Sequence, residues 1–319
     1  MELIGYIFIF LLSCVAFYFS GEIIVKSFNR IAKFLGWKEF VVSFLLMAFI
    51  GSLPNLFVGV SSALHNIPEL SFGEVIGGNL INVTLAIALA SLFSKNGIPV
   101  KSRTINTSLI FTSIAAVLPI LLIWDNVLSR TDGIILISFF FFYIFWLFSK
   151  KDRFTKVCED EQPIQKSFVR SLKSVIKVVF CLVVFALASD MIVRSASFFA
   201  ESFDLPIITI GLFIVALGNC APETFFAIST AKKGMEWMIL GAIMGSIVSQ
   251  STLVIGIVSI LHPIIITDLS PFLIARTFLF IAIFFFFVFT RTGHHITKKE
   301  SVFLLFIYIF FIIFELLFN

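Results

Sequence analysis

The stretch Ala48–Asn55, which reads AFIGSLPN, returns in altered form 168 residues later as Ala216–Glu223, ALGNCAPE. The same offset relates Gly21–Lys26, GEIIVK, to Ser189–Arg194, SDMIVR. No insertion interrupts this register from residue 20 to about residue 89. A constant offset through matched glycines and prolines indicates a duplicated structural unit. Further matched positions are Gly73 and Gly241, Gly77–Asn79 and Gly245–Ile247, and Asn82 and Gln250.

The composition around the repeat is that of a membrane protein. The 319 residues are 59% hydrophobic and only 13% charged, and the mean hydropathy is +1.09. Apolar runs of about 20 residues match the span of a bilayer-crossing helix, and they are continuous rather than alternating, which favours helices over a β-barrel. We expect an all-α polytopic protein with ten spans, at about 2–28, 39–64, 70–93, 104–124, 131–149, 168–198, 205–231, 236–261, 270–290 and 300–318.

The charges in the connections between the spans predict the orientation of the two halves in the membrane. Most of the 23 Lys and Arg residues lie in alternate connections, and the other connections are mainly acidic. The positive-inside rule then places both termini outside. Five spans per half is an odd number, so the two copies must be inverted, as is common in secondary transporters. We therefore expect a first repeat at 1–149, a cytoplasmic linker at 150–167 and a second, inverted repeat at 168–319.

Glycine and proline interrupt four of the predicted spans. Gly51–Pro54 is expected to break the second span and Gly218–Pro222 the seventh, while Gly77–Asn79 and Gly245–Ser246 loosen the third and eighth. Inverted-repeat transporters bind their ions near the bilayer midplane, where helices are interrupted. Proline also frees an upstream carbonyl, which needs a partner in hydrocarbon, and a bound cation is one.

Polar residues accompany each interruption at helical spacing. Glu223 is the most informative, because a carboxylate in the middle of a span is costly and usually functional. Packing of small residues and hydrogen bonding of amides between helices is the competing, purely structural interpretation. Oxygen-bearing side chains that converge from four spans suit a hard cation. The pairs that share a helix face are Ser52 and Asn55, Cys220 and Glu223, Gly78 and Asn82, and Ser246 and Gln250.

Other charged residues in the spans have structural interpretations. Asp190 and Arg194 lie four residues apart and are expected to pair, as are Glu22 and Lys26 at the matching positions. His65 and the other three histidines lie at span ends or in connections without metal-ligand spacing, so we expect them to be solvated. The four cysteines show no zinc or disulfide pattern.

The repeats, their interruptions and their polar positions resemble the alpha-repeats of the calcium/cation antiporter superfamily, to which sodium/calcium exchangers belong. The resemblance covers nearly the whole chain. It implies secondary active antiport by alternating access, with calcium as the family's substrate and sodium, potassium or protons as counter-ion, and it implies no cofactor. The cation-binding positions that it implies are Ala48, Ser52, Asn55, Gly78, Asn82, Ala216, Asn219, Cys220, Glu223, Ser246 and Gln250, with Ala48 and Ala216 acting through backbone carbonyls.

The chain departs from the family pattern at several of these positions. Asn55 stands where the family has Glu, and Gln250 stands where many exchangers have Asp. Asn219, Cys220 and Gly78 replace hydroxyl residues. By this count Glu223 is the one carboxylate left, and a divalent cation beside a single anion keeps a net charge that costs several kcal/mol when buried. The count therefore favours a monovalent cation, or a proton on the glutamate.

Three functions remain open at this point. The first is an antiporter of the sodium/calcium exchanger type, the second an exchanger-like protein that moves only monovalent cations or protons, and the third a membrane sensor or interaction protein without transport. An intramembrane enzyme is disfavoured because no span carries a Ser/His pair, paired Asp residues or a His/Glu metal motif. Nucleic acid is not an expected partner, since basic connections account for the net charge of +4. We expect the lipid bilayer of a plasma (inner) membrane as the location, and the oligomeric state stays open.

Overall fold

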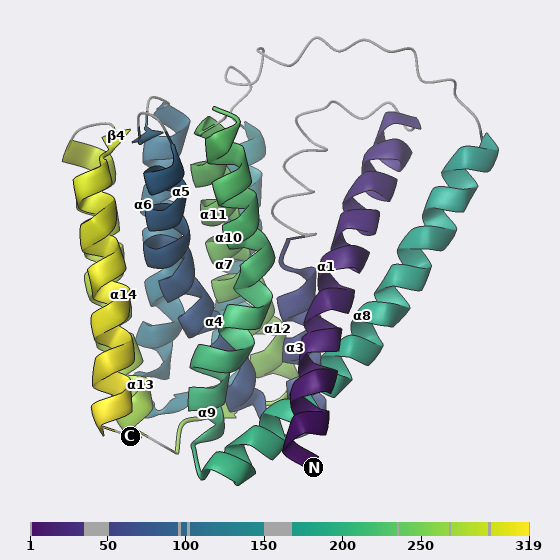
Figure 1. The fold of residues 1–319 in the computed structure, drawn as a ribbon, viewed down its shortest axis with the longest axis vertical. Helices are drawn as coiled ribbons and strands as arrows, with labels where there is room; N and C mark the ends of the chain where they lie inside the picture. The colour runs from purple at the N-terminus through teal and green to yellow at the C-terminus, as the bar shows by residue number, and fades with distance from the viewer. Residues whose placement is uncertain are drawn as a thin grey trace.

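The computed structural model describes residues 2–34, 51–94, 97–100, 103–149, 168–234, 236–267, 269–292 and 295–318. Nearly all of these residues are helical, and within them nine helices are long and apolar enough to cross a membrane. The two described ends of the chain lie on the same side of the bundle (Figure 1). The predicted all-α membrane fold is confirmed. The second predicted span is described only from residue 51, so Ala48 lies outside the described residues.

The helices follow the predicted order in both repeats. Three of the short segments, η2, η5 and η6, are π-helical turns, and η3 is a 3₁₀ turn. The first repeat comprises α1 (Glu2–Phe34), α3 (Leu53–Leu64), α4 (Pro68–Ile81), η2 (Asn82–Ala86), α5 (Ile87–Phe93), α6 (Arg103–Leu122), η3 (Ile123–Asp125) and α7 (Arg130–Ser149). The second comprises α8 (Phe168–Phe203), α9 (Ile207–Ile210), η5 (Gly211–Val215), α10 (Ala216–Lys232), α11 (Trp237–Val248), η6 (Ser249–Val254), α12 (Ile255–Leu261), α13 (Leu269–Thr292) and α14 (Lys298–Phe318).

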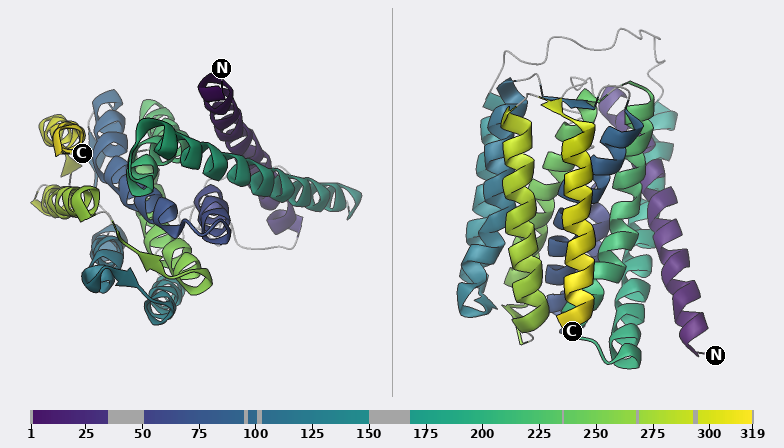
Figure 2. Two further views of the ribbon diagram at one scale, coloured as in Figure 1. Left: turned by 90° about the horizontal axis from the view of Figure 1, so that it is seen from below. Right: turned by 60° about the vertical axis from the view of Figure 1, so that its left-hand side comes forward.

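Two short antiparallel sheets join the repeats at opposite ends of the bundle (Figures 1 and 2). At one end β1 (Ile98–Pro99) pairs with β4 (His295–Ile296), and at the other β2 (Val127–Leu128) pairs with β3 (Ile264–Ile265). The strands β2 and β4 are equivalent at the 168-residue offset, so the repeat continues well past residue 89. Because these equivalent strands lie on opposite faces, the two repeats are inverted, as predicted.

The centre of the protein is a close crossing of α4 with α9 and η5. A Cβ atom at Gly73 would overlap the backbone carbonyl of Ile208, and one at Gly77 would overlap that of Leu212. Small residues let membrane helices approach backbone to backbone, which strengthens their packing. The glycines that were expected only to loosen the third span therefore place α4 directly against the seventh.

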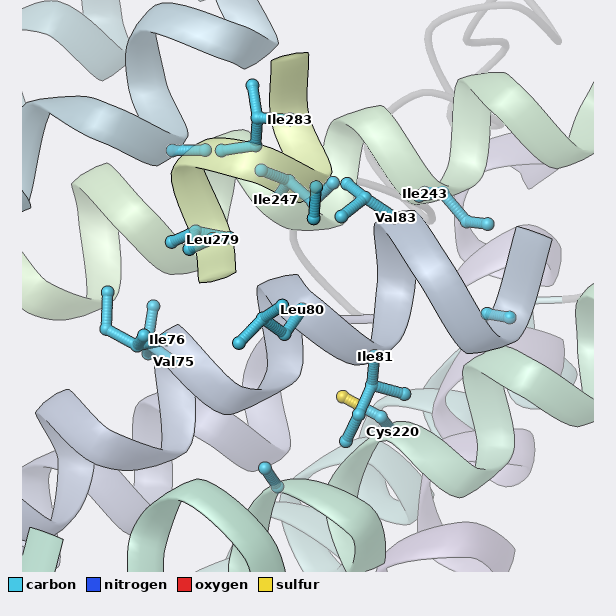
Figure 3. Packing of buried hydrophobic residues seen from close by; sticks show 14 of the residues in the cluster. Val75, Ile76, Leu80, Ile81, Val83, Cys220, Ile243, Ile247, Leu279 and Ile283 are labelled. Carbon is cyan, nitrogen blue, oxygen red and sulfur yellow. The ribbon is translucent and has the colours of Figure 1, made fainter. Parts of the chain in front are cut away.

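Apolar side chains from both repeats fill the space around α4. Figure 3 shows Ile81 beside Cys220 of α10, with Ile247 of α11 and Leu279 of α13 in the same cluster. Cys220 is fully buried within this cluster. The packing fixes α4 between helices of the second repeat and so positions the polar residues that α4 and η2 carry.

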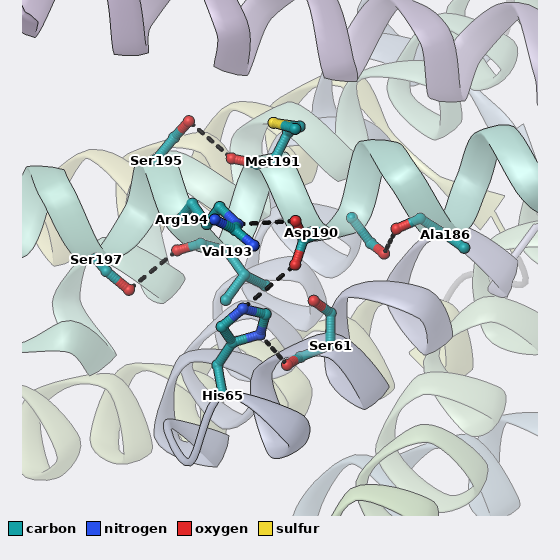
Figure 4. A network of polar contacts seen from close by, with 10 residues as sticks. Ser61, His65, Ala186, Asp190, Met191, Val193, Arg194, Ser195 and Ser197 are labelled. Atoms are coloured by element: carbon teal, nitrogen blue, oxygen red, sulfur yellow. Dashed lines mark hydrogen bonds and ion pairs between the residues drawn. The ribbon is translucent and has the colours of Figure 1, made fainter.

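The long helices α1 and α8 pack along each other at one edge of the bundle (Figure 1). Asp190 of α8 pairs with Arg194 at 2.8 Å, and Glu22 pairs with Lys26 at 2.5 Å, as predicted. His65 is exposed, as expected, and it also makes a contact that the sequence did not predict. His65 ends α3 next to α8, and its Nε2 lies 3.3 Å from the carboxylate of Asp190, while its Nδ1 donates to a backbone carbonyl of α3 (Figure 4).

Asp190→Asn is expected to lower the free energy of unfolding by up to about 1 kcal/mol, because it weakens the contact with His65 that links α3 to α8 and removes the ion pair with Arg194 within α8, both at a partly exposed site. The check is thermal unfolding of the detergent-purified protein. Glu22→Gln is the matched control, since its pair with Lys26 lies within a single helix. An equal loss in the control would show that the link between α3 and α8 adds no stability.

Candidate cation site

Glu223 of α10 lies at the centre of a polar cluster that draws on both repeats. Its carboxylate accepts hydrogen bonds from Asn82 Nδ2 at 2.8 Å, Ser246 Oγ at 2.5 Å and Gln250 Nε2 at 3.3 Å. Gln250 also donates to Ser246 Oγ at 2.7 Å. These donors come from η2, α11 and η6. The structure thus brings together four of the predicted positions, with Asn82, Ser246 and Gln250 around the half-buried carboxylate of Glu223.

π-helical turns position the amides of this cluster. The turn η2 begins at Asn82, and η6 contains Gln250 at the matching position of the second repeat. A π turn widens the helix by one residue and is frequent at functional sites. The predicted loosening at Gly77–Asn79 and Gly245–Ser246 lies within regular α-helix, so the irregular turn follows the glycines by about one turn.

The seventh span is not broken where the sequence predicted. α10 runs without interruption from Ala216 to Lys232 and contains Pro222, and the irregular turn is η5, directly before it. Pro222 has no N–H, so the carbonyl of Gly218 lacks its usual intrahelical donor. Membrane helices tolerate such a proline where neighbouring groups satisfy the freed carbonyl. The second span does begin a new helix at the predicted place, because α3 starts at Leu53.

The remaining predicted positions that the structure describes are Ser52, Asn55, Gly78, Ala216, Asn219 and Cys220. Ser52 approaches Ser249 at 2.7 Å between the hydroxyl oxygens, and Asn55 is buried one turn later on the same helix. Cys220 and Gly78 have no side-chain oxygen that could bind a cation, and their small size lets α4 and α10 approach each other closely. A Cβ atom at Gly78 would lie 3.1 Å from the sulfur of Cys220. Ala216 is buried at the start of α10.

Glu74 of α4 is a second carboxylate that the sequence analysis missed. Its side chain is 1% exposed, and its Oε1 accepts a hydrogen bond from Asn219 Nδ2. Glu223 remains the one carboxylate at the positions that the family pattern marks, and Glu74 lies outside those positions. The repeat gave no hint, because the matching position of the second repeat is Ala242. The spacing within the third span did point to Glu74, because Glu74, Gly78 and Asn82 are four residues apart and so share one face of the helix.

Several oxygen atoms of this region lack a hydrogen-bond donor. Buried acceptors in folded proteins are nearly always paired, and each exception needs an explanation. A cation is the partner that satisfies several acceptors at once. Four of the buried oxygens that have no hydrogen-bond partner in the described part of the chain lie on α4, η2 and η6, and they are Glu74 Oε2, Asn79 Oδ1, Asn82 Oδ1 and Gln250 Oε1.

A cavity of about 520 Å³ leads to the site between α1, α10 and α11. Glu223, Asn219 and Ser246 line its inner part. Ser229 and Met238, near the ends of α10 and α11 that flank Lys232, line the part toward the basic connections. The cavity therefore connects the carboxylate of Glu223 with the side of the membrane that is predicted to be cytoplasmic.

Comparison with known proteins agrees with this architecture. The model of the sodium/calcium exchanger protein family matches residues 5–149 and 173–317, two segments that begin 168 residues apart. The sodium/calcium exchanger MaX1 of Methanosarcina acetivorans is 24% identical over 96% of this chain and 97% of its own. The inner membrane protein YrbG of Escherichia coli is 23% identical over 77% of this chain and 76% of its own.

The fold is also that of a solved exchanger. The structure of the sodium–calcium exchanger NCX_Mj, soaked with Na⁺ and Sr²⁺, superposes with a TM-score of 0.66 at 21% identity and covers 98% of both chains. The match to the family covers both repeats and nearly the whole chain. The protein therefore belongs to the sodium/calcium exchanger protein family.

Proposed function

We propose that this antiporter exchanges calcium for sodium by alternating access at the site around Glu223. The observation that carries the proposal is a half-buried carboxylate, Glu223, that accepts hydrogen bonds from residues of both repeats beside the unpaired oxygens of Asn82 and Gln250. Hard cations such as Ca²⁺ and Na⁺ prefer oxygen ligands of this kind. The names of the relatives, which are sodium/calcium exchangers, support the same ion pair.

The asymmetry of the two repeats supports alternating access. Gly51 and Ala242 both line the cavity, and their equivalents at the 168-residue offset are Asn219 and Glu74, which are joined by a hydrogen bond. The two repeats therefore differ at this pair of positions, since one pair is joined by a hydrogen bond and the other consists of small residues that border the cavity. Rocking of one repeat against the other around this asymmetric pair would move access to the opposite face of the membrane.

The test is uptake of radioactive calcium by purified protein in liposomes. Uptake driven by an outward sodium gradient is the expected result, and proton and potassium gradients in parallel vesicles identify other counter-ions. Absence of calcium uptake under every gradient would overturn the proposal. Fluxes of sodium and potassium in the same vesicles then separate a monovalent-cation exchanger, which the neutral Asn55 and Gln250 favour, from a protein that does not transport.

Ser246→Ala is expected to raise the KM for calcium about tenfold, because it removes a hydroxyl donor to the carboxylate of Glu223 and a hydrogen bond to a charged group is worth about 1.5–3 kcal/mol. The concentration dependence of calcium uptake measures this. Ser229→Ala is the matched control, because Ser229 lines the same cavity farther along α10. A KM that rises equally in both variants would argue against a specific role for the hydroxyl of Ser246.

We also propose the plasma (inner) membrane as the location. The name of the inner membrane protein YrbG supports this for a relative. Fractionation of cells that produce the tagged protein tests it, and recovery in any other membrane would contradict it.

A further inference from the structure

Glu74 is a buried acid that the proposed exchange at Glu223 leaves without a role. It lies on α4, the helix at the centre of the protein, and is 1% exposed. One carboxylate oxygen accepts a hydrogen bond from Asn219, and the other has no donor among the residues that the structure describes. A carboxylate held inside a membrane protein in this way is costly and typically functional.

Two acid–amide pairs connect α4 and its continuation η2 to α10. Glu74 of α4 accepts from Asn219 of α10, and Glu223 of α10 accepts from Asn82 of η2. Asn219 and Glu223 lie four residues apart, which is about 6 Å along a helix. The two carboxylates therefore belong to one site and come from different repeats.

Gly78 lies midway between Glu74 and Asn82 on the helix, so α4 adds no side chain between the two pairs. A Cβ atom at Gly78 would lie 3.1 Å from the sulfur of Cys220 and 3.5 Å from Oε1 of Gln250, an oxygen without a donor in the described ranges. The region between the acids thus carries unpaired oxygen atoms, and the small side chain of Cys220 borders it.

The charges of the site call for a cation of matching charge. In the described segments no Lys, Arg or His forms a salt bridge with Glu74 or Glu223. Two negative charges close together inside the membrane, one buried and one half-buried, are unfavourable without a cationic partner, whereas a divalent cation balances them. We infer that Glu74 is the second anionic ligand of the transported cation and makes the site selective for divalent over monovalent ions. This inference rests on the proposed calcium exchange.

The competing interpretation is that Glu74 only holds α4 against α10 through Asn219. Glu74→Gln separates the two, because glutamine has nearly the same shape and its carbonyl oxygen can still accept from Asn219, while the charge is lost. We expect the Kd for calcium, measured by binding of radioactive calcium to the purified protein, to rise about 100-fold. The Kd for sodium, measured by competition, should change less than about tenfold, because Glu223 still balances one positive charge.

A second carboxylate placed elsewhere in the site should restore calcium binding. Asn55 occupies the position of the first repeat that is equivalent to Glu223, and it is buried. Adding Asn55→Glu to Glu74→Gln should return the Kd for calcium to within about tenfold of the wild-type value. Glu315→Gln, which removes another buried carboxylate near the end of α14, is the matched control and should leave the Kd unchanged.

The outcomes separate this inference from the proposal on which it rests. Calcium exchange by the wild type with an unchanged calcium Kd in Glu74→Gln would overturn the inference alone. No calcium binding by the wild type would overturn both. Should Glu74→Gln not fold, Glu74→Asp decides, because it keeps the charge but shortens the side chain away from Asn219: a calcium Kd within about tenfold of wild type supports the role of the charge, and a 100-fold rise supports the purely structural role.

Discussion

Glu223→Gln is expected to reduce sodium-driven calcium uptake at least about 100-fold, the largest functional effect of any single substitution in the chain. The change removes one of two negative charges inside the membrane and leaves a divalent cation uncompensated, which costs several kcal/mol. It also disturbs the hydrogen bonds that Asn82, Ser246 and Gln250 donate to this carboxylate, since an amide offers a single acceptor oxygen. Initial rates of uptake in liposomes measure the effect.

Two comparisons make the result specific to the site. Glu201→Gln removes an exposed acid at the end of α8 and should transport at the wild-type rate. The elution profile and the unfolding temperature of Glu223→Gln should match those of the wild type closely enough to exclude misfolding. Uptake by Glu223→Gln above about one tenth of the wild-type rate would contradict a central role for this carboxylate.

Gly73→Ala is expected to cause a large loss of stability for so small a substitution, about 1–3 kcal/mol. The added methyl group would overlap the backbone carbonyl of Ile208, and backbone yields far less readily than the end of a flexible side chain. The crossing of α4 with α9 must then widen, which disturbs the site that α4 carries. The unfolding temperature of the detergent-purified protein measures the loss.

The repeat supplies a control for this substitution. Gly241 is equivalent to Gly73 in the second half, and no atom of the described chain lies within 4 Å of a Cβ placed there. Gly241→Ala should therefore be neutral or stabilising, because alanine is favoured over glycine in a helix by up to about 1 kcal/mol. Equal unfolding temperatures for the two variants would contradict the close crossing at Gly73.

The architecture could be predicted because the sequence contains an internal repeat. The 168-residue offset and the alternation of basic connections predicted two inverted halves of five spans, and the strands Val127–Leu128 and His295–Ile296 confirm the inversion at equivalent positions. The positions of the π-helical turns could not be predicted in the same way. A wider turn depends on how neighbouring helices pack, whereas glycine and proline report only local flexibility.

Site residues could be predicted where the internal repeat places polar residues at equivalent positions, and they could not be predicted where it does not. Asn82, Glu223 and Gln250 were found because both halves place polar residues at these positions, Ser246 was found from its helical spacing to Gln250, and the structure joins all four. Glu74 has an alanine as its equivalent, so the symmetry argument passed over it. Its partner Asn219 is 145 residues away in the sequence, and such a long-range contact leaves no trace in local spacing.

That separation has a consequence for the synthesis of the protein. Chains grow at about 5–20 residues per second, so the third span enters the membrane roughly 10–30 s before Asn219 leaves the ribosome. During this interval Glu74 and Asn82 lack the partners that they have in the finished fold, and polar groups in lipid are expensive. The third span must therefore wait beside the insertion machinery, or with Glu74 protonated, until the second repeat arrives. Assembly of the ion site is thus a late event that completes the insertion of the first repeat.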